Sequence, residues 1–109
     1  MDNVYRRDHE MPYISDDAVM AQQKGTKKAI REYNEVMPFE PEKGMDCLER
    51  AGIKHKKNVY FEPPFHCEYG SHIEVGENFY ANTHCVMLDV GKITIGDNVL
   101  FGPNVGIYT

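Results

Sequence analysis

Two histidine–cysteine pairs, His66-Cys67 and His84-Cys85, carry the side chains of this sequence that could do chemistry most directly. They lie eighteen residues apart, so in a fold that repeats every eighteen residues one pair would stack above the other. Imidazole nitrogens and thiolates are zinc ligands, and histidine is also a common general base. Cys85 falls among apolar residues, however, and this favours stacked packing over metal ligation.

The cysteine count points the same way. The chain has three cysteines and no Cys-x-x-Cys pair, which argues against both a disulfide framework and a cysteine-cluster zinc site. We therefore expect reduced thiols and no bound metal. No apolar run approaches the roughly 20 residues of a membrane-spanning helix, and no apolar stretch follows Arg6-Arg7 as in a secretion signal. These features predict a cytoplasmic location without a membrane partner.

The charges exclude one class of partner. The formal net charge is −5, and ten of the twelve Lys and Arg residues lie in residues 1–56. Acidic residues are interleaved with these basic ones, so the chain has little of the positive surface that binds a phosphate backbone. We therefore do not expect a nucleic-acid partner. The 27% charged and 41% hydrophobic content is typical of a globular protein.

The second half of the chain has a repeat of six residues. Two extra residues interrupt this repeat at Val90-Gly91. The repeat then resumes with Ile95-Gly96-Asp97-Asn98 and Phe101-Gly102-Pro103-Asn104. Apolar residues recur in one column, and small or polar residues follow them in the next. The first column holds Tyr69, Val75, Ala81 and Met87, and the second holds Gly70, Gly76, Asn82 and Leu88.

A period of six is too long for simple strand alternation and fits no helical face. It suits a flat strand followed by a tight corner, with Gly, Asn or Asp at corners that need a positive φ. Three such units would close a triangular coil of eighteen residues, and the apolar column would stack inside it. The sequence therefore predicts a parallel β-helix of hexapeptide repeats, with an antiparallel sandwich as the alternative.

The first half predicts helices. One begins at Ser15-Asp16-Asp17, which offers an N-cap, and ends before Pro38. A second runs from near Pro41 to Gly52. We therefore expect a mainly β protein, with an α-helical N-terminal cap over residues 1–56 and the first coils of the β-helix over residues 57–109.

Several strings of the sequence resemble the maltose/galactoside O-acetyltransferase family. The strings are Glu62-Pro63-Pro64-Phe65-His66-Cys67-Glu68-Tyr69-Gly70, Asn78-Phe79-Tyr80-Ala81-Asn82, Val86-Met87-Leu88-Asp89-Val90, and the run from Ile93 to Val105. The helical half is also similar to that family's N-terminal cap, with Asp16 before its first helix and Tyr33-Asn34 near its end. This resemblance implies a left-handed coil, a homotrimer with sites between subunits, and acetyl transfer from acetyl-CoA to a maltose, glucose or galactoside hydroxyl.

The resemblance also implies a site. Asp16, Tyr80, Asn82 and Asp89 match family positions that line the acceptor pocket. Each has another interpretation: Asp16 can favour a helix N-terminus, Tyr80 can pack at a subunit contact, and Asn82 can form a corner. For Asp89, we expect a local loop at Val90-Gly91 to expose the side chain.

Acetyl transfer of this kind needs a base rather than a covalent intermediate, because the thioester is already activated. A histidine removes the hydroxyl proton during direct attack, and donors stabilise the oxyanion. In the family this histidine belongs to an Ala-x-His-Pro element that follows an Ile-Tyr-Thr motif, and here Ile107-Tyr108-Thr109 ends the sequence. The general base is therefore expected beyond Thr109, no catalytic residue is assigned within the chain, and the coenzyme-binding residues are unknown.

Two other functions stay open at this point. His66 and His84 are compatible with a zinc-dependent lyase that resembles the γ-type carbonic anhydrases, which hold zinc between adjacent coils. The chain could also be a non-catalytic module that forms a trimer or binds a partner.

Overall fold

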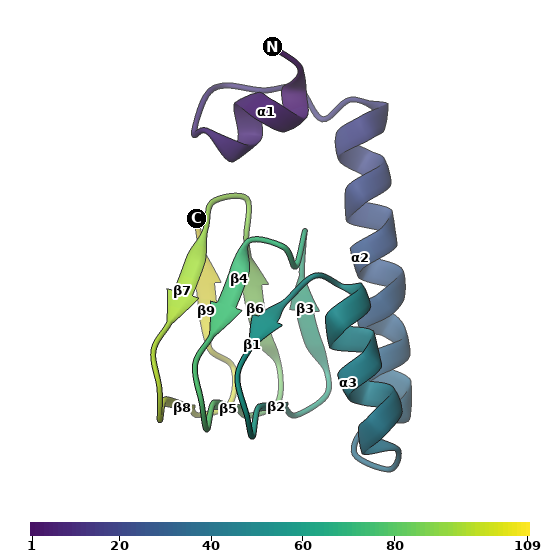
Figure 1. Cartoon of the computed structure of the whole chain (residues 1–109), viewed down its shortest axis with the longest axis vertical. Coiled ribbons are helices and arrows are strands. Elements are labelled where there is room, and N and C mark those ends of the chain that lie inside the picture. The colour runs from purple at the N-terminus through teal and green to yellow at the C-terminus, as the bar shows by residue number, and fades with distance from the viewer.

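The computed structural model describes residues 1–109, with three helices followed by nine short strands (Figure 1). The helices are α1 (Asn3–Asp8), α2 (Asp17–Val36) and α3 (Pro41–Arg50). The strands are β1 (Lys54–His55), β2 (Tyr60–Phe61), β3 (Phe65–Cys67), β4 (Ile73–Val75), β5 (Tyr80–Ala81), β6 (Cys85–Leu88), β7 (Ile93–Ile95), β8 (Leu100–Phe101) and β9 (Gly106–Tyr108). Both helices predicted from the sequence are present, and β1 begins before the predicted boundary at residue 57.

The strands form a three-sided parallel coil. Three sheets of three strands each have the orders β1-β4-β7, β2-β5-β8 and β3-β6-β9, and every pairing is parallel. Consecutive strands of the chain therefore lie on different sides, and each strand pairs with the strand one coil later. The parallel β-helix is confirmed, and the antiparallel sandwich is excluded.

The predicted coil length of eighteen residues is wrong. Tyr60 pairs with Tyr80, which in turn pairs with Leu100, so each strand lies twenty residues from its neighbour. The six-residue period holds along each set of three strands, but two extra residues enter at the corner after the third strand. The sequence shows one such insertion, at Val90-Gly91. A second insertion one coil earlier, within residues 68–72, places Tyr69 at the corner and not among the side chains that point into the coil.

Inward side chains stack in rows along the coil. In the first two coils these rows are buried, with Phe61 above Ala81 and Cys67 above Met87. One corner carries a ladder in which Asn58 donates to Asn78 (2.9 Å) and Asn78 donates to Asn98 (2.8 Å). All three asparagines have positive φ near 60°, as predicted for corners.

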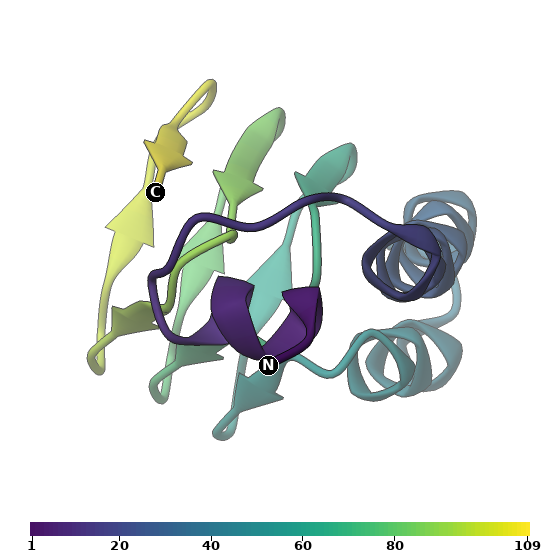
Figure 2. The same cartoon turned by 90° about the horizontal axis from the view of Figure 1, so that it is seen from above.

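Helices α2 and α3 cover the first coil at one end of the β-helix (Figures 1 and 2). Two consecutive residues of α2 form hydrogen bonds with backbone N–H and carbonyl groups of β2 and β3 that no neighbouring strand engages. The Tyr33 hydroxyl donates to the Phe61 carbonyl (2.6 Å) and accepts from the Phe61 N–H (3.0 Å). The Asn34 side chain makes the same two bonds with Phe65, each at 2.9 Å. Apolar contacts of Ala29, Ile30 and Leu48 complete this junction.

Helix α1 was not predicted from the sequence. It starts at an N-cap in which the Asp2 side chain accepts from the Tyr5 N–H (2.8 Å). Seen from above, α1 lies over the coil, away from α2 and α3 (Figure 2). None of the three helices is both long and apolar enough to cross a membrane.

Candidate functional site

Asp16 is the N-cap of α2. One carboxylate oxygen accepts from the Val19 N–H (3.1 Å), and the other accepts from the Asn3 side chain (3.0 Å). The hydrogen bond from Asn3, with that from Val19, lowers the pKa of Asp16, so this carboxylate is ionised near neutral pH. The side chain is half-exposed. The helix-capping interpretation is therefore correct, and it leaves the side chain accessible for a contact with substrate.

Asp89 is not exposed by a loop, and that expectation is wrong. Its side chain is fully buried at the corner between β6 and β7. The two carboxylate oxygens accept three backbone N–H groups of the corner one coil earlier, from Glu68 (2.7 Å), Tyr69 (3.1 Å) and Gly70 (2.7 Å). A short, curved run of N–H groups is a common anion cradle, and here Asp89 fills it. The carboxylate therefore holds two coils together, and any contact with substrate would have to come from its neighbours.

Tyr80 and Asn82 lie on the side of the coil formed by β2, β5 and β8. The Tyr80 ring is half-buried and stacks on Tyr60, with the ring centroids 5.8 Å apart. The Asn82 side-chain oxygen accepts from the Thr83 N–H (2.7 Å), while its NH₂ makes no hydrogen bond within the chain. Asn82 does not have a positive φ, and His84 adopts that conformation nearby. Asn82 therefore presents a free donor at the surface.

The structure does not bring the four predicted residues together in one chain. Asp16 and Asp89 lie at the end of the molecule where α1 and the start of α2 are found, whereas β5 runs along the opposite end (Figure 1). Asp16 and Asp89 therefore lie away from Tyr80 and Asn82. A single site containing all four would need side chains from two copies of the chain.

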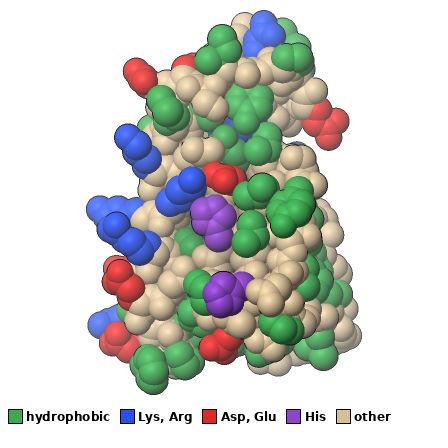
Figure 3. Space-filling view, turned by 180° about the vertical axis from the view of Figure 1, so that it is seen from behind, with side chains coloured by type: hydrophobic (Ala, Val, Ile, Leu, Met, Phe, Trp, Pro, Cys, Tyr) green, Lys and Arg blue, Asp and Glu red, His purple; other side chains and the backbone are tan.

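A polar cluster beside α2 was missed by sequence reasoning. The Lys27 ammonium lies 3.3 Å from a carboxylate oxygen of Glu68, and the His66 Nε2 lies 3.7 Å from the other. The oxygen facing Lys27 is buried and accepts no hydrogen bond. These residues adjoin a groove of about 190 Å³ between α2 and β3, whose lining includes Arg31 and Asn34. Basic side chains and two histidines gather on this rear face (Figure 3).

This cluster forms only because α2 packs against β3. Lys27 and Glu68 are far apart in the sequence, and no motif links them. Lys27 and His66 are each nearly half-exposed, with 45% and 47% of the side chain accessible, so both can donate to a bound hydroxyl.

The histidine–cysteine pairs do not stack. Because the coil has twenty residues, His66 pairs with Val86 and Phe65 pairs with Cys85, so the geometric basis for a zinc site between His66 and His84 is wrong. No group of three or more potential metal-ligating side chains occurs within residues 1–109. All three cysteines are free and buried, and burial raises the pKa of Cys47 and of Cys85 to about 11. Unreactive thiols are what such burial produces.

The chain is similar to sugar acetyltransferases over nearly all of its length. A maltose O-acetyltransferase from Clostridium difficile 630 superimposes with a TM-score of 0.93 and 39% identity, covering 100% of this chain and 59% of that protein. A galactoside acetyltransferase in complex with coenzyme A gives a TM-score of 0.85 and 32% identity, over 97% of this chain and 54% of that one. The chain belongs to the hexapeptide-repeat acetyltransferases.

A curated relative extends this likeness. Nodulation protein L of Rhizobium leguminosarum bv. viciae is 39% identical over 101 residues, which are 92% of this chain and 53% of that relative. No family model matches the chain. The chain spans about half the length of this relative and of the two structures above.

Proposed function

We propose that this chain contributes the acceptor-binding part of an acetyl-CoA-dependent O-acetyltransferase that modifies a sugar hydroxyl. The similarity of the whole chain to a maltose O-acetyltransferase, at a TM-score of 0.93 and 39% identity, carries the proposal. The coil is then expected to wind left-handed, as the family resemblance implies. The galactoside acetyltransferase neighbour, described in complex with coenzyme A, supports acetyl-CoA as the donor.

The proposed reaction is direct transfer. The sugar hydroxyl attacks the thioester carbonyl and its proton goes to a histidine. As the C–S bond breaks, the histidine passes this proton to the sulfur, and coenzyme A leaves as the thiol. The histidine would come from sequence beyond residue 109, as in the family. The residues of this chain have a different task, which is to hold the acceptor so that one hydroxyl faces the thioester.

Asp16, Tyr80 and Asn82 are the side chains that we assign to the acceptor. Ionised Asp16 can accept from sugar hydroxyls, the free NH₂ of Asn82 can donate to them, and the Tyr80 ring offers an apolar face. Lys27 and His66 add donors beside the groove on the rear face. Asp89 acts indirectly, because its carboxylate shapes the corner.

The separation of these side chains favours a site shared between subunits. Asp16 caps the start of α2 and Asn82 follows β5, and these two elements lie at opposite ends of the molecule (Figure 1), so a site that uses both residues would need one from each of two copies. The outward row of β2, β5 and β8 also contains apolar surface that another subunit could cover, since Leu100 is 75% exposed. We therefore propose a homotrimer with the acceptor sites between neighbouring subunits.

The test is acceptor-dependent release of coenzyme A thiol by the full-length protein, assayed with acetyl-CoA and a panel containing maltose, glucose and galactosides. We expect release with at least one sugar, and Asn82→Ala should raise the KM for that sugar while leaving the KM for acetyl-CoA unchanged. Tyr60→Phe is the matched control, because Tyr60 lies one coil before Tyr80 and its hydroxyl is engaged by Glu62. A trimeric protein that binds sugar without any release would instead support the non-catalytic module.

A further inference from the structure

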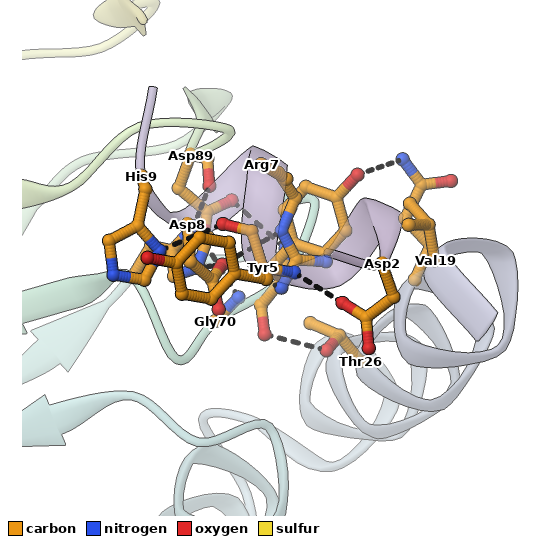
Figure 4. Close-up of polar contacts among 12 residues, drawn as sticks. Asp2, Tyr5, Arg7, Asp8, His9, Val19, Thr26, Gly70 and Asp89 are labelled. Atoms are coloured by element: carbon orange, nitrogen blue, oxygen red, sulfur yellow. Dashed lines mark hydrogen bonds and ion pairs between the residues drawn. The ribbon is translucent and has the colours of Figure 1, made fainter. Parts of the chain in front are cut away.

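Helix α1 is fixed to the coil by polar contacts. The Arg7 side chain is only 2% exposed, and its guanidinium carbon lies 4.1 Å from the centroid of the Tyr69 ring. The next residue, Asp8, reaches His72 at the start of β4. Figure 4 shows Arg7 and Asp8 close to Gly70 and Asp89, the residues at the two stacked corners. These contacts join the N-terminal arm to the corner that Asp89 stabilises.

His72 lies between two hydrogen-bond acceptors. Its side chain is 7% exposed, with Nδ1 2.7 Å from the Asp89 carbonyl oxygen and Nε2 2.9 Å from the Asp8 carboxylate. A neutral imidazole carries one N–H, so it could satisfy only one of these partners and would direct a lone pair at the other. The observed geometry is complete only when both ring nitrogens carry a proton.

Asp8 cannot supply the missing proton. Arg7 donates to the same Asp8 oxygen from Nε (3.0 Å) and from Nη2 (2.8 Å). Burial raises the pKa of Asp8, but the hydrogen bonds and charges of Arg7 and His72 outweigh it, and the net effect is a lowered pKa. Asp8 is therefore a carboxylate, and the oxygen that accepts from Arg7 also faces Nε2 of His72.

Several other titratable and aromatic groups lie around His72. The Asp89 carboxylate is engaged by three backbone N–H groups, and the Tyr69 ring lies 5.5 Å from the imidazole. A cavity of about 200 Å³ separates α1 from the second corner. The titratable groups that line it are Arg7, Asp8, His9, Glu10, His72 and Lys92.

The other end of α1 holds Asp16. The Asn3 side chain donates to the Asp16 carboxylate (3.0 Å), and its oxygen accepts from the Ile14 N–H (2.9 Å). Asn3 thereby fixes the oxygen of Asp16 that the helix cap leaves free. A continuous set of contacts thus runs from the Asp89 corner through His72 and α1 to Asp16.

We propose that α1 is a latch, held closed by a doubly protonated His72, and that the closed latch positions the Asp16 carboxylate. His72 and Asn3 are then positioning residues. The value of this position for acetyl transfer rests on the proposed function, whereas the latch itself does not.

The first test is limited trypsin digestion, because Arg6 and Arg7 are tryptic sites that a closed latch protects. His72→Gln should speed cleavage after these residues about tenfold, as expected for losing one charge-assisted hydrogen bond. His9→Gln is the control, since His9 lies on the same arm and its side chain contacts Tyr5, through a hydrogen bond to the carbonyl and stacking on the ring. Cleavage after Lys28, within α2, is followed in the same digest to recognise a variant that does not fold.

The outcomes are distinct. A folded His72→Gln protein that is cut after Arg7 no faster than wild type overturns the latch, and so does equal acceleration by His9→Gln. If His72→Gln does not fold, His72→Asn provides the second variant. Ring ¹⁵N chemical shifts test the protonation state, and we expect both His72 nitrogens to carry a proton in the closed form. One unprotonated ring nitrogen in the closed form would contradict the proposal.

The last arm uses the full-length protein. Asn3→Ala should raise the KM for the sugar acceptor several-fold, with the KM for acetyl-CoA unchanged. If wild type shows no acceptor-dependent thiol release, the proposed function fails, while digestion and NMR still judge the latch. If wild type is active and Asn3→Ala has the same KM for sugar, the positioning role fails alone.

Discussion

The first and third coils of residues 1–109 are built from the same repeat but differ in how they are covered. In the first coil, α2 and α3 pack on the inward rows, and Tyr33 and Asn34 satisfy the edges of β2 and β3. In the third coil Ile93 is buried, but the other inward side chains are only partly buried, and within residues 1–109 no side chain from a helix pairs with the outer edges of β7, β8 and β9. A hexapeptide repeat therefore specifies the path of the chain, while stability depends on what lies against each coil.

The largest expected effect on stability comes from two phenylalanines that stack in the same row of inward side chains. Phe61 and Phe101 occupy matching positions two coils apart, with Phe61 fully buried and Phe101 partly buried. Phe61→Ala should lower the free energy of unfolding by about 3–5 kcal/mol, because it opens a cavity against two phenylalanine rings. Phe101→Ala should cost about 1–2 kcal/mol, since part of its surface already contacts water. Urea unfolding of the 109-residue chain measures both, and equal losses would contradict the comparison.

Two carboxylates make the same contrast between coils. Asp89 joins the second coil to the first through three backbone N–H groups, and Asp97 joins the third to the second through one, from Glu77 (2.7 Å). Asp89→Asn should destabilise by about 2–3 kcal/mol, because an amide cannot accept all three bonds. Asp97→Asn should cost less than about 1 kcal/mol, because the side chain is 50% exposed. Thermal unfolding in matched buffer compares them, and a larger loss for Asp97→Asn would reverse the ranking.

The repeat predicted the coil, but its length depended on a corner that the sequence disguised. Tyr69-Gly70 matches Val75-Gly76 in residue type, so a six-residue alignment runs through residues 68–72 without a visible break. The structure places Tyr69 against Arg7 instead. Arg7 comes from a helix that has no apolar periodicity, so no local pattern could have revealed the contact.

In the candidate site, too, local features could be predicted from the sequence, whereas contacts between distant segments could not. Asp16 was predicted at a helix start because capping is a local property, and the structure confirms the cap. The burial of Asp89 was not predictable, because its partners are backbone groups twenty residues earlier that become neighbours only when the coil closes. Lys27 and Glu68 likewise meet only once α2 lies against the first coil.

The contribution of α2 to the stability of the first coil can be tested at a single hydroxyl, that of Tyr33. Tyr33→Phe removes the oxygen that bonds both backbone groups of Phe61, and it leaves a buried N–H and carbonyl without partners. We expect a loss of about 2 kcal/mol. Tyr60→Phe, one residue from Phe61, removes a hydroxyl that bonds only to the Glu62 side chain and should cost about 0.5 kcal/mol. Hydrogen exchange at the Phe61 amide should accelerate in Tyr33→Phe alone. An unchanged rate there would mean that apolar packing, and not the hydroxyl, closes the edge.

The smallest expected effect is the difference in stability loss between a middle residue and an end residue of the asparagine ladder. Asn78 bonds to asparagines on both sides, whereas Asn98 bonds only to Asn78. Both have φ near 60°, so alanine at either position carries a similar backbone penalty of about 1 kcal/mol. The difference between Asn78→Ala and Asn98→Ala therefore isolates one exposed hydrogen bond, and it should be about 0.5 kcal/mol. Asn78→Gly, which tolerates the positive φ, should recover most of the Asn78→Ala loss in the same urea titrations. If it recovers nothing, the ladder bonds contribute more than the backbone conformation, and the corner is stabilised by its side chains.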